Sequence, residues 1–396
     1  MSWISPRVIR GNRGDIASRY CILSELISAG VDVHVVFATR PEHVPSALRG
    51  RVASYGPIYN LWPRVEGLRA FFRSRYVVWT GGLDLQDDSS LVKLVHMWIV
   101  FASYRALGLR ILLAMQGAGP LTTPTGRWLA RRVLALVDVA LLRDRGSLEL
   151  VAGLARQEKL VLAHDGIFLS GLSTDSEEDF EQRAPLETKL RIGLNLRLWF
   201  HFASSWIPYQ FARDRYRARA EEPMSRIVDA LAALIRHLRR EHNAEIVLLS
   251  MYEPDIEPWE DDQPLLDRLK VLFAEDDGVV LFRDDVTIES FASTIGRLDL
   301  MIGTRLHSTL IALRMGVPAL HIAYTGKGRA IYCDLGLADW LVGLEELLDS
   351  PDLLIKMADE VLSNPDAPAR VTRLVAKAVD ENEKALRAAI ARMEMS

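Results

Sequence analysis

Arg305 and His307 are the residues whose types and spacing say most about chemistry, because they lie two positions apart after the apolar run 298–302. In an extended chain, residues i and i+2 project to the same side, so the guanidinium and the imidazole can point into one pocket. We expect a helix from about Ser308, a favourable N-cap residue, to Gly316. A cation, a titratable ring and a helix N-terminus in one place favour an anionic ligand. The same pattern also fits a surface cap and a structural histidine.

Two more cationic side chains follow predicted strands. Arg143 comes directly after the apolar run 137–142, where it either forms a buried salt bridge or points at a carboxylate or phosphate. Lys327 lies between two glycines after the run 319–323. In open α/β sheets, ligands bind beyond the carboxyl ends of the strands, so we expect both cations at the cleft of the arginine–histidine pair. Asp165 also stands at a strand exit, and we expect it to anchor a loop.

Three glycine-containing segments, residues 11–15, 81–84 and 116–120, lie beside other predicted elements. Each can present backbone N–H groups to an oxyanion, or form a simple tight turn. The first lacks the spacing of a dinucleotide-binding fingerprint, and Asp15 within it can cap the following helix. The sequence contains no serine-nucleophile, zinc-protease or P-loop motif.

The elements that must position these residues are short apolar runs alternating with helical patterns. The expected strands are 33–37, 76–80, 110–115, 137–142, 160–163, 190–194, 245–250, 279–282, 298–302 and 319–323. The expected helices between them are 16–29, 91–107, 125–136, 225–240, 264–273 and 288–297. Such alternation is typical of parallel sheet covered by helices on both faces.

We therefore expect an α/β protein with two Rossmann-like domains facing a cleft. The N-terminal domain spans 1–170, an acidic linker 171–189 and the C-terminal domain 190–345, with C-terminal helices over 346–396. The amphipathic pattern 367–395 predicts a long helix that packs back across the first domain.

Composition excludes several classes of protein. The 396 residues carry a net charge of −4, which gives no global attraction to nucleic acid, so an anionic substrate needs a local cationic cluster. The two cysteines, Cys21 and Cys333, are too few for a zinc site or a disulfide framework and fit a reducing compartment. We expect no metal at the site.

The N-terminus lacks the basic-then-apolar pattern of a signal peptide. The stretch 94–104 is 11 residues without a formal charge, well short of the roughly 18 needed to span a bilayer. We expect a cytoplasmic protein without a transmembrane segment, and contact with the inner face of the membrane stays open.

The order of these motifs resembles the polysaccharide pyruvyl transferase family over most of residues 11–340. The matching motifs are Gly11-Asn12-x-Gly14-Asp15, Gly81-Gly82 with Asp87 downstream, Gln116–Pro120, Arg143-Asp144-x-x-Ser147, Gly303–His307 followed by Gly316-x-Pro318, and Tyr324-x-x-Lys327. Two features depart from the family pattern. Leu83 stands where a third glycine is common, and Pro6 and Arg7 make the first strand look short and polar for an inner strand.

The resemblance implies a two-domain fold like that of the glycosyltransferase B group. It also implies transfer of pyruvate from phosphoenolpyruvate to a sugar, commonly as a cyclic ketal across two hydroxyls of a cell-surface polysaccharide or its precursor. His307 and Arg305 match the donor-site motif of the family, and Arg143 matches an arginine associated with donor binding. The donor site is then in the C-terminal domain, and the acceptor side in the N-terminal domain.

Phosphoenolpyruvate carries a carboxylate and a phosphate, and we expect Arg143, Arg305 and Lys327 to hold these anions. His307 is the candidate general acid that protonates the enol carbon, because an imidazole changes protonation near physiological pH. Asp15 is a candidate for orienting or deprotonating an acceptor hydroxyl. Further residues assigned to substrate binding are Gly11, Asn12, Gly117 and Ser308. The scheme uses no cofactor beyond the donor substrate.

Two alternatives stay open. One is a glycosyltransferase that uses a nucleotide sugar on a similar fold, and the other is a non-catalytic glycan-binding relative. The acceptor sugar, the ketal linkage, attachment of the acceptor to a lipid, the general base and the oligomeric state are also open.

Overall fold

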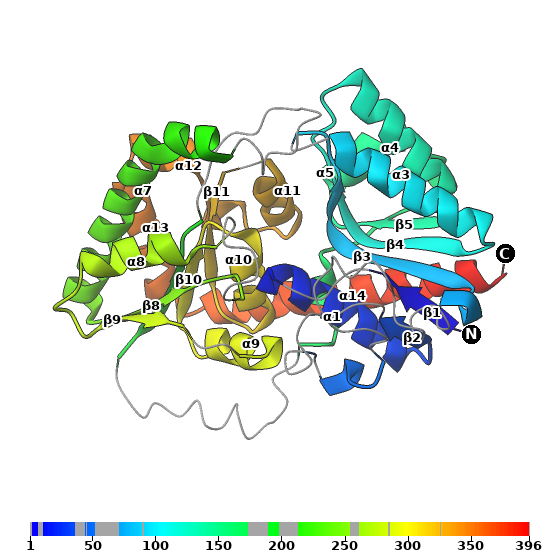
Figure 1. Ribbon diagram of the computed structural model, residues 1–396. Coiled ribbons are helices and arrows are strands. Elements are labelled where there is room, and N and C mark those ends of the chain that lie inside the picture. Colours follow the sequence, from blue (N-terminus) through cyan, green and yellow to red (C-terminus); the bar gives the residue numbers. More distant parts are fainter. Residues whose placement is uncertain are drawn as a thin grey trace.

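The computed structural model describes residues 2–6, 11–35, 44, 46–51, 71–88, 91–172, 189–197, 213–253, 261–283, 286–324 and 326–395, with only the backbone over 213–220. Within this part of the chain there are two parallel six-stranded sheets, each flanked by helices, in two domains that lie side by side (Figure 1). Two Rossmann-like α/β domains, as the sequence predicts, are thereby confirmed. Most of the expected acidic linker, residues 173–188, lies outside the described residues.

The first sheet has the strand order β2-β1-β3-β4-β5-β6. Its strands are β1 (Ser2–Ser5), β2 (Asp32–Val35), β3 (Tyr76–Leu85), β4 (Arg110–Ala118), β5 (Val139–Leu142) and β6 (Leu160–Leu162). Its helices are α1 (Arg13–Ser28), α3 (Leu91–Ala106), α4 (Pro124–Leu136) and α5 (Arg145–Ala152), with the short 3₁₀ turns η2 (Ser46–Leu48), η3 (Gln157–Lys159) and η4 (Gly166–Phe168).

The second sheet has the order β12-β11-β10-β7-β8-β9. Its strands are β7 (Arg191–Asn195), β8 (Glu245–Leu249), β9 (Val279–Phe282), β10 (Leu300–Gly303), β11 (Ala319–Ala323) and β12 (Leu341–Gly343). The helices are α7 (Arg213–His242), α8 (Gln263–Val271), α9 (Ile288–Gly296), α10 (Leu306–Arg314), α11 (Gly326–Asp334), α12 (Leu344–Asp349), α13 (Asp352–Ser363) and α14 (Ala367–Met395), with the 3₁₀ turn η6 (Ala338–Trp340).

The first strand corrects one expectation. β1 is short, yet it lies inside the sheet between β2 and β3, and its side chains Trp3 and Ile4 are fully buried. Two large apolar residues in alternate directions are enough to fill both faces of a parallel sheet at this position. Pro6 comes after the strand and removes no hydrogen bond from its ladder.

Two glycine segments expected as loops are strand instead. β3 runs past Thr80 through the glycine pair, and β4 runs past Met115 through Gly117. The two extensions pair with each other, Gly82 with Gln116 and Leu83 with Gly117. Met115 adopts φ +50° where the pairing with β5 shifts register, so the strand bends without ending. The backbone of these segments is therefore part of the sheet.

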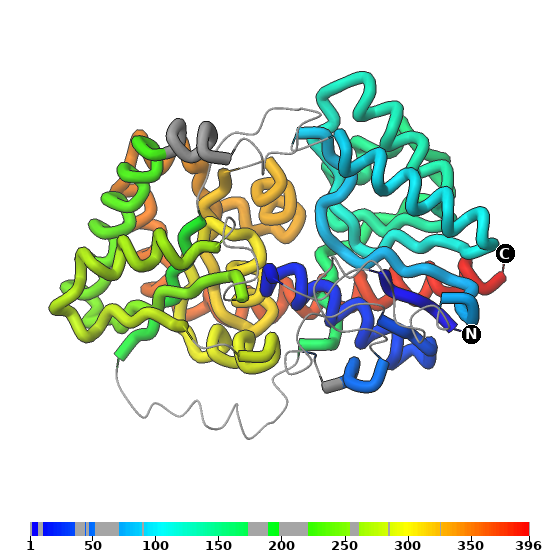
Figure 2. The backbone as a smooth tube through the Cα atoms, in the orientation of Figure 1, coloured from blue at the N-terminus to red at the C-terminus, as the bar shows by residue number. Residues whose placement is uncertain are grey.

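The C-terminal helix joins the two domains. Helices α12 and α13 pack against α7 in the second domain, whereas α14 contacts β4, β5 and η4 of the first. Figure 2 shows this helix as the red tube that crosses from the second domain under the first sheet. One apolar core runs from the α1 side of the first sheet, through α10 and α14, to the second sheet. A separate core lies on the other face of the first sheet, beneath α3 and α4.

Candidate active site

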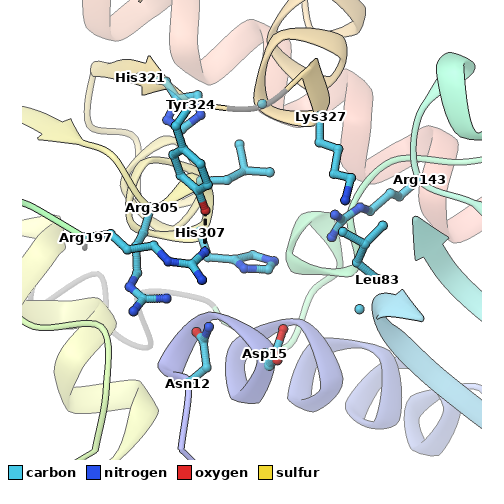
Figure 3. Close-up of a pocket in the computed structure, with 13 residues that line it drawn as sticks. Asn12, Asp15, Leu83, Arg143, Arg197, Arg305, His307, His321, Tyr324 and Lys327 are labelled. Atoms are coloured by element: carbon cyan, nitrogen blue, oxygen red, sulfur yellow. Dashed lines mark hydrogen bonds between the residues drawn. The ribbon is translucent and has the colours of Figure 1, made fainter. Parts of the chain in front are cut away.

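A cavity of about 160 Å³ lies between the two domains (Figure 3). Residues from β3, α1 and the segment after β5 line it on one side, and residues after β7, β10 and β11 line it on the other. They are Asn12, Asp15, Gly82, Leu83, Arg143, Arg197, Arg305, Leu306, His307, His321, Tyr324, Lys327 and Gly328. The expectation that strand exits from both domains meet at one cleft is therefore correct.

Three helices begin at this cavity. Asn12 is the N-cap of α1 and accepts a hydrogen bond from the Gly14 N–H at 2.9 Å. Arg305 is the N-cap of α10, and α11 begins at Gly326, next to Lys327. Each N-terminus carries partial positive charge, so three of them in one place favour a bound anion.

Asp165 brings the two central side chains of the cavity together. Its Oδ2 lies 2.9 Å from Nη1 of Arg143 and 3.4 Å from Nε2 of His307. Asp165 and Arg143 are only 1% and 5% exposed, and His307 is 14% exposed. Arg143 and His307 both line the cavity, so this pair of side chains is within reach of a ligand.

The charge of Asp165 is held in place by its neighbours. Burial of this carboxyl raises its pKa, but His307 and Arg143 more than offset that effect and lower the pKa well below its usual range. Asp165 is therefore an anion at any working pH, and its charge faces the His307 ring. Its Oδ1 also accepts the Ile167 N–H at 3.2 Å, so Asp165 anchors a loop as well.

Gly117 lies behind Arg143. A Cβ on Gly117 would stand 2.8 Å from Nε of Arg143, so only glycine leaves room for the guanidinium. Gly117 is not among the described residues that line the cavity, and its expected contact with substrate is replaced by this supporting role.

Helix α10 begins two residues earlier than expected, and this separates Arg305 from His307. The Arg305 and His307 side chains point in different directions (Figure 3). Arg305 turns toward Asp262, with its Nε 2.7 Å from Oδ1, while Nε2 of His307, in the first helical turn, lies 3.4 Å from Asp165 Oδ2. Both side chains still line the cavity, but from different sides.

Ser308 is not the N-cap. It is fully buried within the helix, where its hydroxyl donates to the Arg305 carbonyl at 2.7 Å, and it is not among the described lining residues.

A buried network fixes the Arg305 guanidinium. Asp262 is completely buried and also accepts from Nδ2 of Asn195 at 3.1 Å, while Asn195 Oδ1 accepts the Arg305 N–H at 3.2 Å. Burial lowers the pKa of Arg305, but Asp262 outweighs it and the net shift is upward. The guanidinium is thus a permanent cation. No sequence signal links Asp262 to this site, because it comes from a separate strand–helix unit.

Lys327 reaches across the cleft to the first domain. Its Nζ donates to Oε1 of Gln86 at 2.8 Å, and it points to the same part of the cavity as Arg143 (Figure 3). Burial lowers the pKa of Lys327 to about 7, with Arg143 adding to the shift and Asp88 opposing it. The site therefore holds a cation that is partly neutral near pH 7.

The structure adds residues to the expected set, two of them with ionisable groups. Arg197, which follows β7, lines the cavity and donates from Nη1 to the Tyr324 hydroxyl at 2.5 Å. His321 in β11 is buried, with Nδ1 3.1 Å from the Gly303 carbonyl, and burial lowers its pKa to about 4. It is a neutral imidazole. Its place inside an apolar strand gave no signal of a site.

The start of α1 is tied to the second domain. The Gly11 N–H donates to Oε2 of Glu253 at 2.6 Å, and the Arg13 N–H donates to the Met251 carbonyl at 2.8 Å. Gly11 is not among the described lining residues, so this interdomain contact is its observed role. Asp15 lines the cavity and lies 3.5 Å from Nη2 of Arg19 on the next turn.

Gly14 lets α1 approach α10. A Cβ on Gly14 would stand 2.2 Å from Cβ of His307, which is far closer than real contacts allow. The glycine therefore fixes how close the first domain comes to the candidate acid.

A separate cluster could hold a metal ion. His237, His242 and Asp359 place ligand atoms within 4.8 Å of one another, at the far side of the second domain. Both Nε2 atoms are within hydrogen-bond distance of the Asp359 carboxylate, at 2.8–3.0 Å. None of the three is among the described cavity residues, so we give the cluster no part in the reaction.

Comparison with known proteins gives both a family and a fold. Residues 12–326 match the family model described as polysaccharide pyruvyl transferase. The amylovoran biosynthesis protein AmsJ of Erwinia amylovora is 34% identical over 82 residues, which is 21% of this chain and 19% of that relative. The chain thus spans about a fifth of the length of that relative.

Solved structures with the same architecture are known. UDP-GlcNAc 2-epimerase from Neisseria meningitidis, bound to UDP-GlcNAc, aligns over 100% of both chains with a TM-score of 0.57 and 11% identity. Anabaena HepE in complex with UDP-glucose aligns over 99% of both chains with a TM-score of 0.58 and 11% identity. At such low identity these likenesses show the fold alone.

Within the described residues, no helix is both long enough and apolar enough to cross a bilayer.

Proposed function

This chain belongs to the polysaccharide pyruvyl transferase family, and we propose that it transfers the pyruvyl group of phosphoenolpyruvate to sugar hydroxyls as a ketal. The acceptor is a cell-surface polysaccharide or its precursor. This would be a transferase reaction that needs no cofactor beyond the donor.

One observation carries the proposal: Arg143 and His307 share the Asp165 carboxylate, and both side chains line the cavity. A cation for an anionic donor and an acid for its double bond thus stand side by side. This is the pair of groups that protonation of an enol phosphate requires.

The donor has two anionic ends, and the cavity has cations on two sides. Arg143 and Lys327 lie together near β3, and Arg197 and Arg305 lie on the opposite side of His307 (Figure 3). We assign the phosphate and the carboxylate to these two groups of cations. The N-termini of α10 and α11 add partial positive charge.

The reaction then proceeds in two steps. Protonated His307 gives its proton to the methylene carbon of the donor, the carbon–carbon double bond becomes a methyl group, and an acceptor hydroxyl oxygen bonds to the neighbouring carbon. That hydroxyl loses its proton as the bond forms, and over the whole reaction this proton replaces the one that His307 gave. A second hydroxyl attacks the same carbon, the carbon–oxygen bond to phosphate breaks, and inorganic phosphate leaves with the second proton.

Asp15 is the carboxylate best placed to serve the acceptor. It lines the cavity from the first domain, on the helix whose start contacts His307. We propose that it orients or deprotonates an acceptor hydroxyl.

Ligand-induced thermal shifts test the donor. Millimolar phosphoenolpyruvate should raise Tm by a few degrees, because binding only the folded state stabilises it. His307→Ala should keep this shift but lose acceptor-dependent phosphate release, and Arg143→Ala should lose the shift. If phosphoenolpyruvate has no effect while UDP-glucose or UDP-GlcNAc stabilises the native chain, a nucleotide-sugar enzyme replaces the proposal. Binding of glycans without any phosphate release would favour a non-catalytic relative.

A further inference from the structure

Two neighbouring surface helices have an unusual charge composition. The 16 residues of α3 and the 13 of α4 contain no Asp or Glu, although the whole chain has 52 acidic residues among 396. Their basic residues are Lys93, Arg105, Arg127, Arg131 and Arg132. Lys93 and Arg105 form ion pairs with Asp84 and Asp138, both at 2.9 Å, so the three arginines of α4 make the cationic region.

The outward side of α3 is apolar. Its buried residues are Leu91, Leu94, Met97 and Phe101, which face the core. On the opposite side, Val92 is 44% and Ile99 57% exposed, and the exposed residues between them and beyond, His96 and Ser103, carry no formal charge. A surface helix normally presents charged residues to water, so this face is a candidate interaction surface.

The outward side of α4 is basic and aromatic. Trp128 is 47% exposed and packs edge-on against Trp98 of α3, with ring centroids 5.8 Å apart. The Arg132 guanidinium lies 5.2 Å from the Trp128 ring centroid, and Arg127 and Arg131 are also exposed. An apolar strip, a tryptophan at its border and a row of arginines thus lie side by side. We call the outward residues of these two helices the α3–α4 face (Figure 1).

Two more features extend this surface. Phe72, 74% exposed, and Leu107, 56% exposed, lie near the C-terminal end of α3, where Phe71 packs on Tyr104 with centroids 5.4 Å apart. Beside α4, a hollow of about 710 Å³ is lined by Arg127, Trp128 and Arg131 together with residues of α5, among them Glu149. The hollow holds two guanidinium groups and one carboxylate, so its net charge still favours an anionic head group.

We propose that the α3–α4 face docks on the surface of a membrane that contains anionic lipids. The apolar strip would enter the interface, the tryptophans would lie at head-group level, and the arginines would meet lipid phosphates. A neutral protein partner would leave the arginines without acidic residues to pair with. An anionic protein partner would place further charges beside the uncharged apolar strip, so both fit less well. The charge complementarity therefore selects the lipid surface.

The face borders the catalytic cavity. Nζ of Lys93 near the start of α3 donates to the carbonyl of Leu83, which lines the cavity, at 2.8 Å. At the start of α4, Thr123 donates to Asp87 at 2.7 Å, just beyond the end of β3. The amino ends of both helices thus adjoin the strand ends that form the site. Resting on the proposed function, this places a lipid-linked acceptor within reach of His307, whereas docking itself does not depend on that function.

Vesicle flotation tests the docking. The full chain should float with vesicles of phosphatidylcholine containing phosphatidylglycerol, and should remain unbound with phosphatidylcholine alone. Arg131→Gln with Arg132→Gln should weaken binding about thirty-fold, at about five-fold for each cationic side chain near an anionic surface. Ile99→Glu should also release the protein, because it places a charge in the apolar strip. Val271→Glu, at a position 72% exposed on α8 of the second domain, is the matched control and should bind normally.

Three outcomes would overturn the proposal. In the first, the native chain binds neutral and anionic vesicles equally well. In the second, the double arginine variant and Ile99→Glu both bind anionic vesicles as the native chain does. In the third, the native chain binds no vesicles but forms a dimer, and Ile99→Glu dissociates that dimer. The last outcome would assign the face to a second copy of the chain. Phosphate release with a water-soluble acceptor should be the same for Ile99→Glu and native protein. Its absence in the native chain would count against the proposed function and not against docking.

Discussion

At the residue scale, the chemistry of the cavity depends on one buried carboxylate. Asp165 pairs with both Arg143 and His307 in a largely buried place. The arrangement resembles a carboxylate that orients a catalytic imidazole, since it fixes the direction of the ring.

Asp165→Asn tests that role. The variant keeps the shape of the side chain but loses the charge that pairs with His307, so kcat for phosphate release should fall about 100-fold with a smaller change in KM. It should also lower Tm, because Arg143 loses its buried partner. Asp138→Asn, which removes an ion pair to Arg110 at the amino edge of the sheet, is the control. A native kcat in Asp165→Asn would exclude the orienting role.

Lys327 predicts a pH dependence of donor binding. Its pKa is lowered to about 7, so the side chain is charged below that pH and neutral above it. Donor affinity should therefore decrease as pH rises from 6 to 8, beyond the change due to ionisation of the donor itself. Lys327→Arg keeps the charge throughout this range and should remove the extra decrease. Equal pH profiles of Kd in the two proteins would contradict the assignment.

The residues at strand exits could be predicted from sequence, but their partners could not. Arg143, His307 and Lys327 follow apolar runs that are recognisable strands, and parallel strands end at one edge. Asp165 and Asp262 become neighbours of cations only through tertiary packing, and no local pattern encodes that. The prediction therefore located the site without the network that sets its charges.

At the element scale, the largest errors were at boundaries. The glycines at 81, 82 and 117 are typical turn signals, yet here they lie in extensions of β3 and β4. The two extensions pair with each other through their backbones, which keeps both strands extended. Helix α10 begins before Ser308 because Arg305 takes the N-cap position and its side chain is held by Asp262. In both cases long-range pairing overrides a local preference.

Gly14→Ala tests how closely α1 must approach α10. The added methyl would meet His307 at 2.2 Å, so either the ring moves or the helices separate, at a cost of about 1–3 kcal/mol in stability. We expect a lower Tm and a loss of transfer activity larger than the loss of donor binding. Gly153→Ala is the matched control, because a Cβ there meets nothing within 4 Å and its φ is −80°. Equal behaviour of the two variants would show that the contact is dispensable.

At the scale of the whole molecule, α14 couples the domains to the site. Asn382 of this helix is completely buried, and its side chain accepts the His164 N–H at 2.6 Å and donates to the carbonyls of Asp165 and Phe168 at 2.9 and 3.2 Å. An element that follows the second domain thus holds the loop of the first domain that carries the orienting carboxylate.

Asn382→Leu should reveal this coupling. The change removes three hydrogen bonds to the backbone of residues 164–168, so stability should fall by about 2–4 kcal/mol in thermal or urea unfolding. At a temperature where the variant is folded, kcat should also fall, while Lys384→Ala on the exposed side of α14 should leave both quantities near native. Loss of stability with a native kcat would assign Asn382 to the fold alone.

The position of the two ends of the described chain has a practical consequence. The Arg75 N–H donates to the carbonyl of Ser2, the Arg110 N–H donates to the carbonyl of Arg75, and the Arg110 guanidinium donates to the carbonyl of Met393. Ser2 and Met393 are therefore near neighbours at the amino edge of the first sheet, opposite the strand ends that form the cavity. A short peptide could join these two positions head to tail, and an affinity tag or surface tether attached beside either one would leave the entrance for substrates unobstructed.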